Sequence, residues 1–199
     1  KTFKNKTVIV TGHTGFKGSW LSLWLASLGA KVIGISNSIP SEPSNFIASG
    51  LDKITEDIRL DIRDADLVSK IIETHQPDFV FHLAAQALVR TSYNSPLETI
   101  TTNAIGSANI LEGIRKLNKP VSVVMITSDK VYDNVEWMWG YRETDRLGGK
   151  DPYSASKGMA ELAIRTYIES FYSHSSSNIK VGIARAGNVI GGGDWAIDR

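Results

Sequence analysis

Apolar runs of strand length alternate with longer stretches of helical period along this chain, and the alternation limits the folds it can adopt. The strand-like runs lie at residues 7–11, 31–36, 58–60, 78–84, 121–128 and 180–186. The helical stretches lie between them, at residues 16–28, 65–74, 97–117 and 153–172. Because parallel strands need crossover connections, this order predicts an α/β protein with a doubly wound parallel sheet flanked by helices.

Two stretches have no regular period. Residues 37–50 contain Pro40, Pro43 and several serines, so we expect a loop. Residues 129–152 are aromatic, charged and glycine-bearing, and we expect them to form a loop region beside the active site. Gly29 is the expected stop of the first helix.

Three glycines stand between the first strand and the first helix, in "VIVTGHTGFKGSWL". Gly12, Gly15 and Gly18 let the backbone turn tightly and approach a pyrophosphate, whose charge is met by free N–H groups at the helix N-terminus. A strand-to-helix turn alone would also use such glycines, but strand, turn and helix occur in the order that dinucleotide binding requires. The sequence therefore predicts a Rossmann-type sheet and an NAD(P) cofactor.

Residues after the second and third strands bear on the adenosine end of the cofactor. Ser36 stands where an acidic residue usually binds the ribose, which leaves the choice between NAD and NADP open, and Lys17 favours a phosphate. Asp61 is a candidate for hydrogen-bonding the adenine, or else only a helix cap.

Tyr153 and Lys157, in "YSASK", lie four residues apart at the start of a helix, so both side chains share one face. A lysine cation beside a phenol favours the phenolate, which can take a proton from a substrate hydroxyl. Ser128, at the end of a buried strand, can bond the same oxygen. These three residues predict an oxidation site.

The glycine turn, "HLAA" after the fourth strand, the serine ending the fifth and Y-x-x-x-K together resemble the extended short-chain dehydrogenases over the whole chain. The resemblance implies that NAD is the cofactor and that Asn103 supports the site from its helix. It also implies a cofactor lining of Phe16, Ile62, Leu83, Ala84 and Ala85, besides the residues above.

Within that family, "TSDKVYDNVEWMWGYRETDRLGGKDPYSASK" and "ARAGNVIGGGDWAIDR" resemble the CDP-glucose 4,6-dehydratases. The likeness implies a catalytic pair, with Lys130 as the base at C5 and Asp129 as the acid at the departing C6 hydroxyl. This assignment requires Lys130 to be neutral and Asp129 protonated during elimination, the reverse of their resting preferences. It also implies CDP-glucose as the substrate.

The resemblance further implies contacts to the sugar nucleotide. The loop with Asn134, Trp137 and Trp139 is expected to border the sugar, or to be packing that closes the domain. Asn188 is expected to touch the diphosphate, and Arg185 and Arg199 are available to pair with phosphates.

The resemblance also implies a domain division and an assembly. We expect residues 1–180 to form the NAD(P)-binding Rossmann domain with the catalytic residues. Residues 181–199 are then the start of a substrate-binding domain that is largely missing. The chain is expected to form a homodimer, with the helices near residues 97–117 and after Tyr153 at the interface.

Composition excludes several classes of protein. A formal net charge of +1 leaves no basic surplus for a nucleic-acid partner. The absence of cysteine rules out disulfides, a thiol nucleophile and sulfur-rich metal sites, and we expect no metal. No apolar run approaches the ~20 residues of a membrane span, and no signal-type region follows "KTFKNK", so we expect no membrane contact and a cytoplasmic location.

Three functions stay open at this point. The first is a dehydratase, the second is a nucleotide-sugar epimerase or reductase of the same family, and the third is a non-catalytic NAD(P)-binding module.

Overall fold

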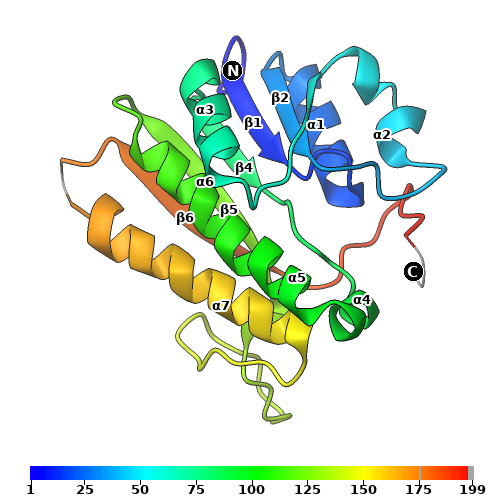
Figure 1. The fold of residues 1–199 in the computed structure, drawn as a ribbon, viewed down its shortest axis with the longest axis vertical. Helices are drawn as coiled ribbons and strands as arrows, with labels where there is room; N and C mark the ends of the chain where they lie inside the picture. The colour runs from blue at the N-terminus through cyan, green and yellow to red at the C-terminus, as the bar shows by residue number, and fades with distance from the viewer. Residues whose placement is uncertain (175, 197–199) are drawn as a thin grey trace.

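The fold is a six-stranded, wholly parallel sheet in the order β3-β2-β1-β4-β5-β6 (Figure 1). The structure is a computed structural model that describes residues 1–174 and 176–196. The strands are β1 Thr7–Thr11, β2 Lys31–Ser36, β3 Glu56–Arg59, β4 Phe79–His82, β5 Val121–Ser128 and β6 Ile179–Ala186. This strand order is that of the Rossmann fold, so the predicted fold class is confirmed.

Helices cover both faces of the sheet. They are α1 Phe16–Ser27, α2 Asn45–Ala48, α3 Ala65–His75, α4 Val89–Asn94, α5 Pro96–Ile100, α6 Gly106–Arg115 and α7 Pro152–Tyr167. On one face α3 packs against α6 and α6 against α7, whereas α1 lies on the other face against β1 and β2. Short turns of 3₁₀ type are η1 Leu51–Lys53 and η3 Asp129–Val131, and π-helical turns are η2 Thr101–Ile105 and η4 Ile168–Tyr172.

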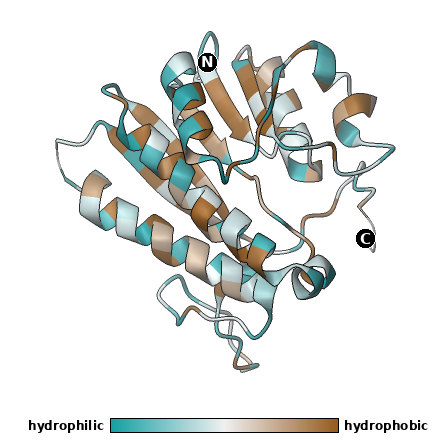
Figure 2. Cartoon of the chain, in the orientation of Figure 1, coloured by the Kyte–Doolittle hydropathy of each residue, from teal (hydrophilic) through white to brown (hydrophobic). Residues whose placement is uncertain are grey.

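Successive residues of the central strands feed two separate cores. Ile9 joins the larger core under α3, α6 and α7, while Val8 and Val10 join a smaller one with Leu25 of α1. Side chains alternate across a strand, and both faces here are covered, so the central strands are apolar throughout. Figure 2 shows this as brown strands beneath helices of mixed colour. The edge strand β3 instead carries the exposed Glu56 and Asp57.

The helices differ from the sequence prediction in four places, one of which is the helix expected at 153–172, where α7 ends at Tyr167 and the π turn η4 follows. The prediction of a loop over residues 37–50 was wrong at α2, which Ser44 caps by accepting the Ile47 N–H at 3.3 Å while Phe46 is buried. Helix α4 was not predicted. The helix expected at 97–117 starts at Pro96, ends at Arg115 and is interrupted by the π turn η2.

β6 continues the sheet beyond residue 180, where the sequence analysis divides the chain. All eight of its residues pair with β5, from Ile179 opposite Val121 to Ala186 opposite Ser128. After β6 the chain turns toward α2, where Gly193 lies against Asn45 (Figure 1). Within the described residues, no helix is both long and apolar enough to span a bilayer.

Candidate active site

The predicted glycine turn joins β1 to α1 with little space to spare. Gly12 has φ +73°, and a Cβ built on it would lie 2.7 Å from the Ala84 backbone nitrogen. A Cβ on Gly18 would collide with the carbonyl oxygen of Gly12. A Cβ on Gly15 would meet only that oxygen, at 3.4 Å. Gly12 and Gly18 are thus required by packing, whereas the space at Gly15 is open to a ligand.

The first turn of α1 has the features of an anion site. Gly15 is its N-cap, no acidic side chain lies in the turn, and Lys17 does. The segment after β6 folds over this turn, because Trp20 Nε1–H donates to the Gly192 carbonyl oxygen at 2.8 Å. The hollow between them is lined by Phe16, Lys17, Trp20, Val189, Ile190 and Gly191. A pyrophosphate fits this turn through N–H groups, the helix dipole and the lysine.

Ser36 supports the glycine turn from the end of β2. Its hydroxyl lies 3.0 Å from Nδ1 of the buried His13 and accepts the Thr14 N–H at 3.4 Å. His13 Nε2 lies 3.1 Å from Asp57 Oδ1. The carboxylate of Asp57 favours a charged imidazole, but burial has the larger effect and lowers the pKa of His13. The ribose contact predicted for Ser36 stays a prediction.

Asp61 and Ile62 follow β3, as the sequence predicted. Arg63 donates from Nε to Asp61 Oδ2 at 2.9 Å, and this hydrogen bonding holds the pKa of the Asp61 carboxyl below its usual range. Ile62 is buried, with its side chain against Gly106 of α6. Asp61 is half-exposed and ionised, which suits an adenine amino group as partner.

Ser128, Asp129 and Lys130 form a compact turn at the end of β5. Ser128 Oγ donates to Asp129 Oδ1 at 3.0 Å and accepts the Lys130 N–H at 3.2 Å. Lys130 Nζ lies 3.3 Å from the same Asp129 oxygen, with side chains 40% and 52% exposed. The two residues assigned opposite proton-transfer roles are therefore in direct contact and open to solvent.

Tyr153 and Lys157 lie in the first turns of α7, which Asp151 caps by accepting the Ser154 N–H at 3.0 Å. Both side chains are largely buried. Burial, with the charge of Lys17 second, lowers the pKa of Lys157 to about 8. Lys157 thus remains a cation at neutral pH, within electrostatic reach of the cofactor turn.

The sheet brings these groups together at the carboxyl ends of its strands. The glycine turn follows β1, Leu83–Ala85 follow β4, and Ser128 ends β5. Helix α7 contacts both β5 and η3. The sequence analysis did not assign four buried polar residues near these strand ends. Thr11 and His82 end β1 and β4, and Ser107 and Ser156 lie in α6 and α7. The signal for His82 was available, since it is the one basic residue in the otherwise apolar run "FVFHLAA".

The expectation that Arg185 is available for a phosphate was wrong. Its Nε donates to the two carboxylate oxygens of Glu161 at 2.9 and 3.0 Å, and its Nη1 to the Tyr132 hydroxyl at 2.7 Å. Glu161 is fully buried, and only 11% of the Arg185 side chain is exposed. A buried carboxylate requires such a partner, so the guanidinium is already used.

The other predicted substrate residues lie in exposed segments that follow β5 and β6, or outside the described residues. Asn134 is in the exposed 129–152 loop, where its Oδ1 accepts the Tyr141 hydroxyl proton at 2.9 Å, and Trp137 packs on the same tyrosine ring. Trp139 is 71% exposed. Asn188 is exposed just after β6. Arg199 lies outside the described residues. Their roles stay predictions.

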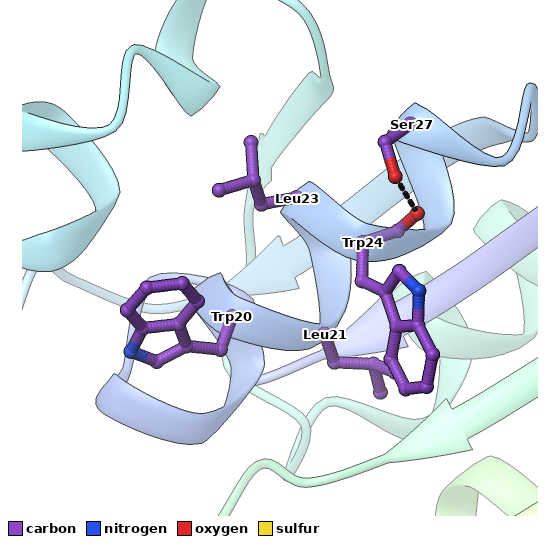
Figure 3. A pocket seen from close by; sticks show the side chains of 5 residues that line it. All are labelled: Trp20, Leu21, Leu23, Trp24 and Ser27. Atoms are coloured by element: carbon purple, nitrogen blue, oxygen red, sulfur yellow. Dashed lines mark hydrogen bonds between the residues drawn. The ribbon is translucent and has the colours of Figure 1, made fainter. Parts of the chain in front are cut away.

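A second hollow lies along the outer side of α1. Figure 3 shows its lining, which consists of Trp20, Leu21, Leu23, Trp24 and Ser27. The hollow contains no titratable side chain, so it can bind apolar groups but has no acid or base for catalysis.

Residues 9–181 match the family model described as GDP-mannose 4,6 dehydratase. The chain belongs to this family. It is 49% identical to CDP-glucose 4,6-dehydratase of Salmonella typhimurium, over 99% of this chain and 56% of that protein. It is 29% identical to a dTDP-glucose 4,6-dehydratase of Xanthomonas campestris, over 83% of this chain and 50% of that protein.

Solved structures of the dehydratase and epimerase group share the fold. UDP-glucose 4-epimerase of Thermus thermophilus, in complex with NAD, superposes with a TM-score of 0.78 at 29% identity, covering 93% of this chain and 56% of that chain. The enzyme of the same name from Thermotoga maritima, with UDP-glucose, gives 0.78 at 27% identity, with the same coverage. The chain therefore spans about half the length of the relatives it matches.

Proposed function

We propose that this protein is an NAD-dependent CDP-glucose 4,6-dehydratase, a lyase that converts CDP-D-glucose to CDP-4-dehydro-6-deoxy-D-glucose and water. The observation that carries the proposal is the contact of Asp129 with Lys130, directly after Ser128 at the end of β5. Helix α7, which carries Tyr153 and Lys157, packs against this turn. The 49% identical Salmonella relative bears the same name. An epimerase or reductase needs no such acid–base pair.

The cofactor site fits NAD. Gly15 leaves open space, and the first turn of α1 offers N–H groups to a pyrophosphate. The Asp61 carboxylate accepts from Arg63 and keeps further lone pairs for the adenine amino group. The Thermus epimerase with this fold is an NAD complex. When bound, NAD+ accepts a hydride from the sugar and returns it within the same turnover.

Each catalytic residue then has one task. Tyr153, as a phenolate favoured by the Lys157 cation, takes the proton of the C4 hydroxyl while C4 loses its hydride, and Ser128 bonds the same oxygen. The resulting ketone acidifies the C5–H bond. Lys130 takes that proton and Asp129 protonates the C6 hydroxyl, so that water leaves and a C5=C6 double bond forms. The hydride taken from C4 would then be delivered to C6, and Lys130 would return its proton to C5. The proton gained by Tyr153 balances the one that Asp129 gave to water, so exchange with solvent restores the starting state.

Elimination requires Lys130 to start neutral and Asp129 protonated, whereas in the structure the two form a solvent-exposed ion pair. Moving one proton from Lys130 to Asp129 across this 3.3 Å contact produces that state. Exclusion of water by the bound sugar would favour the neutral pair, because a low dielectric penalises both charges.

The test is mass spectrometry of CDP-, dTDP-, GDP- and UDP-hexoses after incubation with the protein and NAD+. We expect CDP-glucose alone to lose one water.

The Lys130→Met variant is expected to oxidise C4 but to lose water about a hundredfold more slowly, because the base is gone. Its matched control is Lys150→Met in the neighbouring loop. Isomerised or reduced sugar without water loss would instead establish an epimerase or reductase, and cofactor binding without any conversion would indicate a non-catalytic module.

A homodimer is part of the same proposal. Helices α5 and α7 contact each other, and apolar side chains on them and on the turns beside them are exposed. They include Leu97 of α5, Ile105 of η2, and Met159 and Leu162 of α7, and Tyr93 of the adjoining α4 is exposed as well. A second copy packed on this face would remove that apolar area from water.

The cytoplasmic location stays our prediction from the sequence.

Leu162→Glu is expected to convert the dimer to a folded monomer, because Leu162 is 57% exposed on α7 and a charge there would be desolvated at the interface. Sedimentation velocity measures the change. Leu67→Glu, at a 46% exposed position on α3, is the matched control and should leave the dimer intact. A dimer that survives Leu162→Glu would place the interface elsewhere.

A further inference from the structure

Buried polar side chains link the carboxyl ends of β1 and β4 to helix α6. Thr11 Oγ1 accepts the Ala84 N–H at 3.1 Å, and it shares the Leu83 N–H with the Thr11 carbonyl oxygen, each at 3.1 Å. Thr11 Oγ1 also lies 2.7 Å from His82 Nδ1, and His82 Nε2 lies 2.9 Å from Ser107 Oγ. Thr11 and His82 are 0% and 2% exposed. Side-chain oxygens thus contact both nitrogens of the imidazole.

The position of the imidazole proton follows from the hydroxyl of Ser107. Ser107 Oγ lies 2.7 Å from the Asn103 carbonyl oxygen, which can only accept, so the one hydroxyl proton of Ser107 is donated there. His82 Nε2, 2.9 Å from the same Ser107 oxygen, must then be the donor, which places the imidazole proton on Nε2. Nδ1 is left as an acceptor for the Thr11 hydroxyl proton.

Asn103 extends the connection to the catalytic helix. Its Nδ2 donates to Ser156 Oγ at 2.8 Å, and Ser156 Oγ donates to the Tyr153 carbonyl oxygen at 2.6 Å. Its Oδ1 accepts the Gln86 N–H at 2.8 Å, which ties down the segment after β4. Asn103 lies in the π turn η2, and such turns recur at functional sites.

We propose that His82, as a neutral imidazole with its proton on Nε2, is a positioning residue that couples the cofactor-lining segment after β4 to the helix turn carrying Tyr153. The proposal rests on the proposed function for its kinetic consequence, but not for its geometry. A rigid link of this kind fixes the phenol relative to the nicotinamide site, where small displacements cost large factors in rate.

The surroundings of His82 oppose its protonation. In a protonated imidazole both nitrogens donate, so Nδ1 could no longer accept the Thr11 hydroxyl proton and that hydrogen bond would be lost. Burial, with the charge of Lys157 second, lowers the pKa of His82 to about 3. The charge of Lys17 already lowers the pKa of Lys157. A neutral His82 adds no further positive charge beside Lys157, so it is compatible with a charged Lys157.

The first test is nitrogen NMR of the protein labelled with ¹⁵N-histidine. The sequence has four histidines, and the signal missing from His82→Gln assigns this one. We expect the Nε2–H tautomer, unchanged as the pH falls through the ordinary histidine range near ~6.5. An Nδ1–H tautomer, or protonation in that range, would overturn the proposal. This result does not depend on any activity.

The second test measures sugar oxidation at saturating NAD+. Ser107→Ala interrupts the link and should slow hydride transfer about ten- to a hundredfold, with the KM for the sugar nucleotide nearly unchanged. Ser107→Thr keeps the hydroxyl and should restore most of the rate. The control is Ser92→Ala, since Ser92 is equally buried but donates only to the Val89 carbonyl oxygen.

Full activity in Ser107→Ala, or an equal loss in Ser92→Ala, would contradict the positioning role. If the unsubstituted protein oxidises no sugar, the proposed function fails, and the NMR measurement still decides the protonation and tautomer of His82.

Discussion

Replacing Tyr153 by phenylalanine is expected to lower the rate of sugar oxidation about a hundred- to ten-thousandfold, the usual contribution of a positioned acid or base. Phenylalanine keeps the packing of this 8% exposed ring and removes only the hydroxyl that takes the C4 proton. The measurement is the nicotinamide absorbance in a single turnover, which reports hydride transfer without the later elimination. Substrate affinity should change little.

The matched control is Tyr172→Phe. Tyr172 is also buried, but its hydroxyl donates to the Leu111 carbonyl oxygen at 2.6 Å, on the side of the core away from the glycine turn. Its loss should cost about 1 kcal/mol of unfolding free energy and leave hydride transfer intact. Equal rates in Tyr153→Phe and the unsubstituted protein would remove Tyr153 from the mechanism.

Lys157 sets the pH dependence of the same step. Burial lowers the pKa of Lys157 to about 8, so the cation is the main form at pH 7. Lys157→Met removes the charge that favours the phenolate. The rate at neutral pH should fall and recover as the pH is raised, with the half-maximal point at higher pH than before.

Glu161→Ala is expected to destabilise the fold by about 3–5 kcal/mol, because it leaves the guanidinium of Arg185 without its buried partner. Glu161 also accepts the Thr127 hydroxyl proton at 3.1 Å and pairs with Arg165 at 3.1 Å. Arg185 in turn lies over the Tyr132 ring, 4.6 Å from its centroid. This cluster therefore holds α7, β5, β6 and the start of the 129–152 loop together.

Urea unfolding followed by circular dichroism measures this loss. Arg165→Met is the control: that side chain is 37% exposed, so removing it should cost less than about 1 kcal/mol. The double variant Glu161→Leu, Arg185→Met removes both buried charges and should regain much of the stability. A loss in Glu161→Ala no larger than in Arg165→Met would show that the cluster does not brace the site.

The cluster also bears on catalysis. Thr127 and Tyr132 flank the turn of Ser128, Asp129 and Lys130. Glu161 bonds Thr127 directly and Tyr132 through Arg185, so the cluster fixes both ends of the segment that carries the proposed acid and base. A stability loss in Glu161→Ala should therefore come with slower elimination.

Local rules explain the parts of the fold that the sequence predicts well. The strands Thr7–Thr11, Lys31–Ser36 and Val121–Ser128 match their predicted bounds, because each is a mostly apolar run of strand length bounded by turn or loop segments. The π turn η2 has no such local signal, and neither does α2, which depends on the burial of Phe46 against His13.

The sequence by itself determined the order of strands and helices, the glycine turn and the four-residue spacing of Tyr153 and Lys157. Those features depend on backbone sterics and on periods of two and 3.6 residues, which act between neighbours in the chain. Only the tertiary structure decided that Arg185 serves Glu161, 24 residues away, and that His82 bonds Thr11, 71 residues away. A buried polar group bonds whatever the packed strands bring within reach, and that choice is made by topology rather than by local sequence.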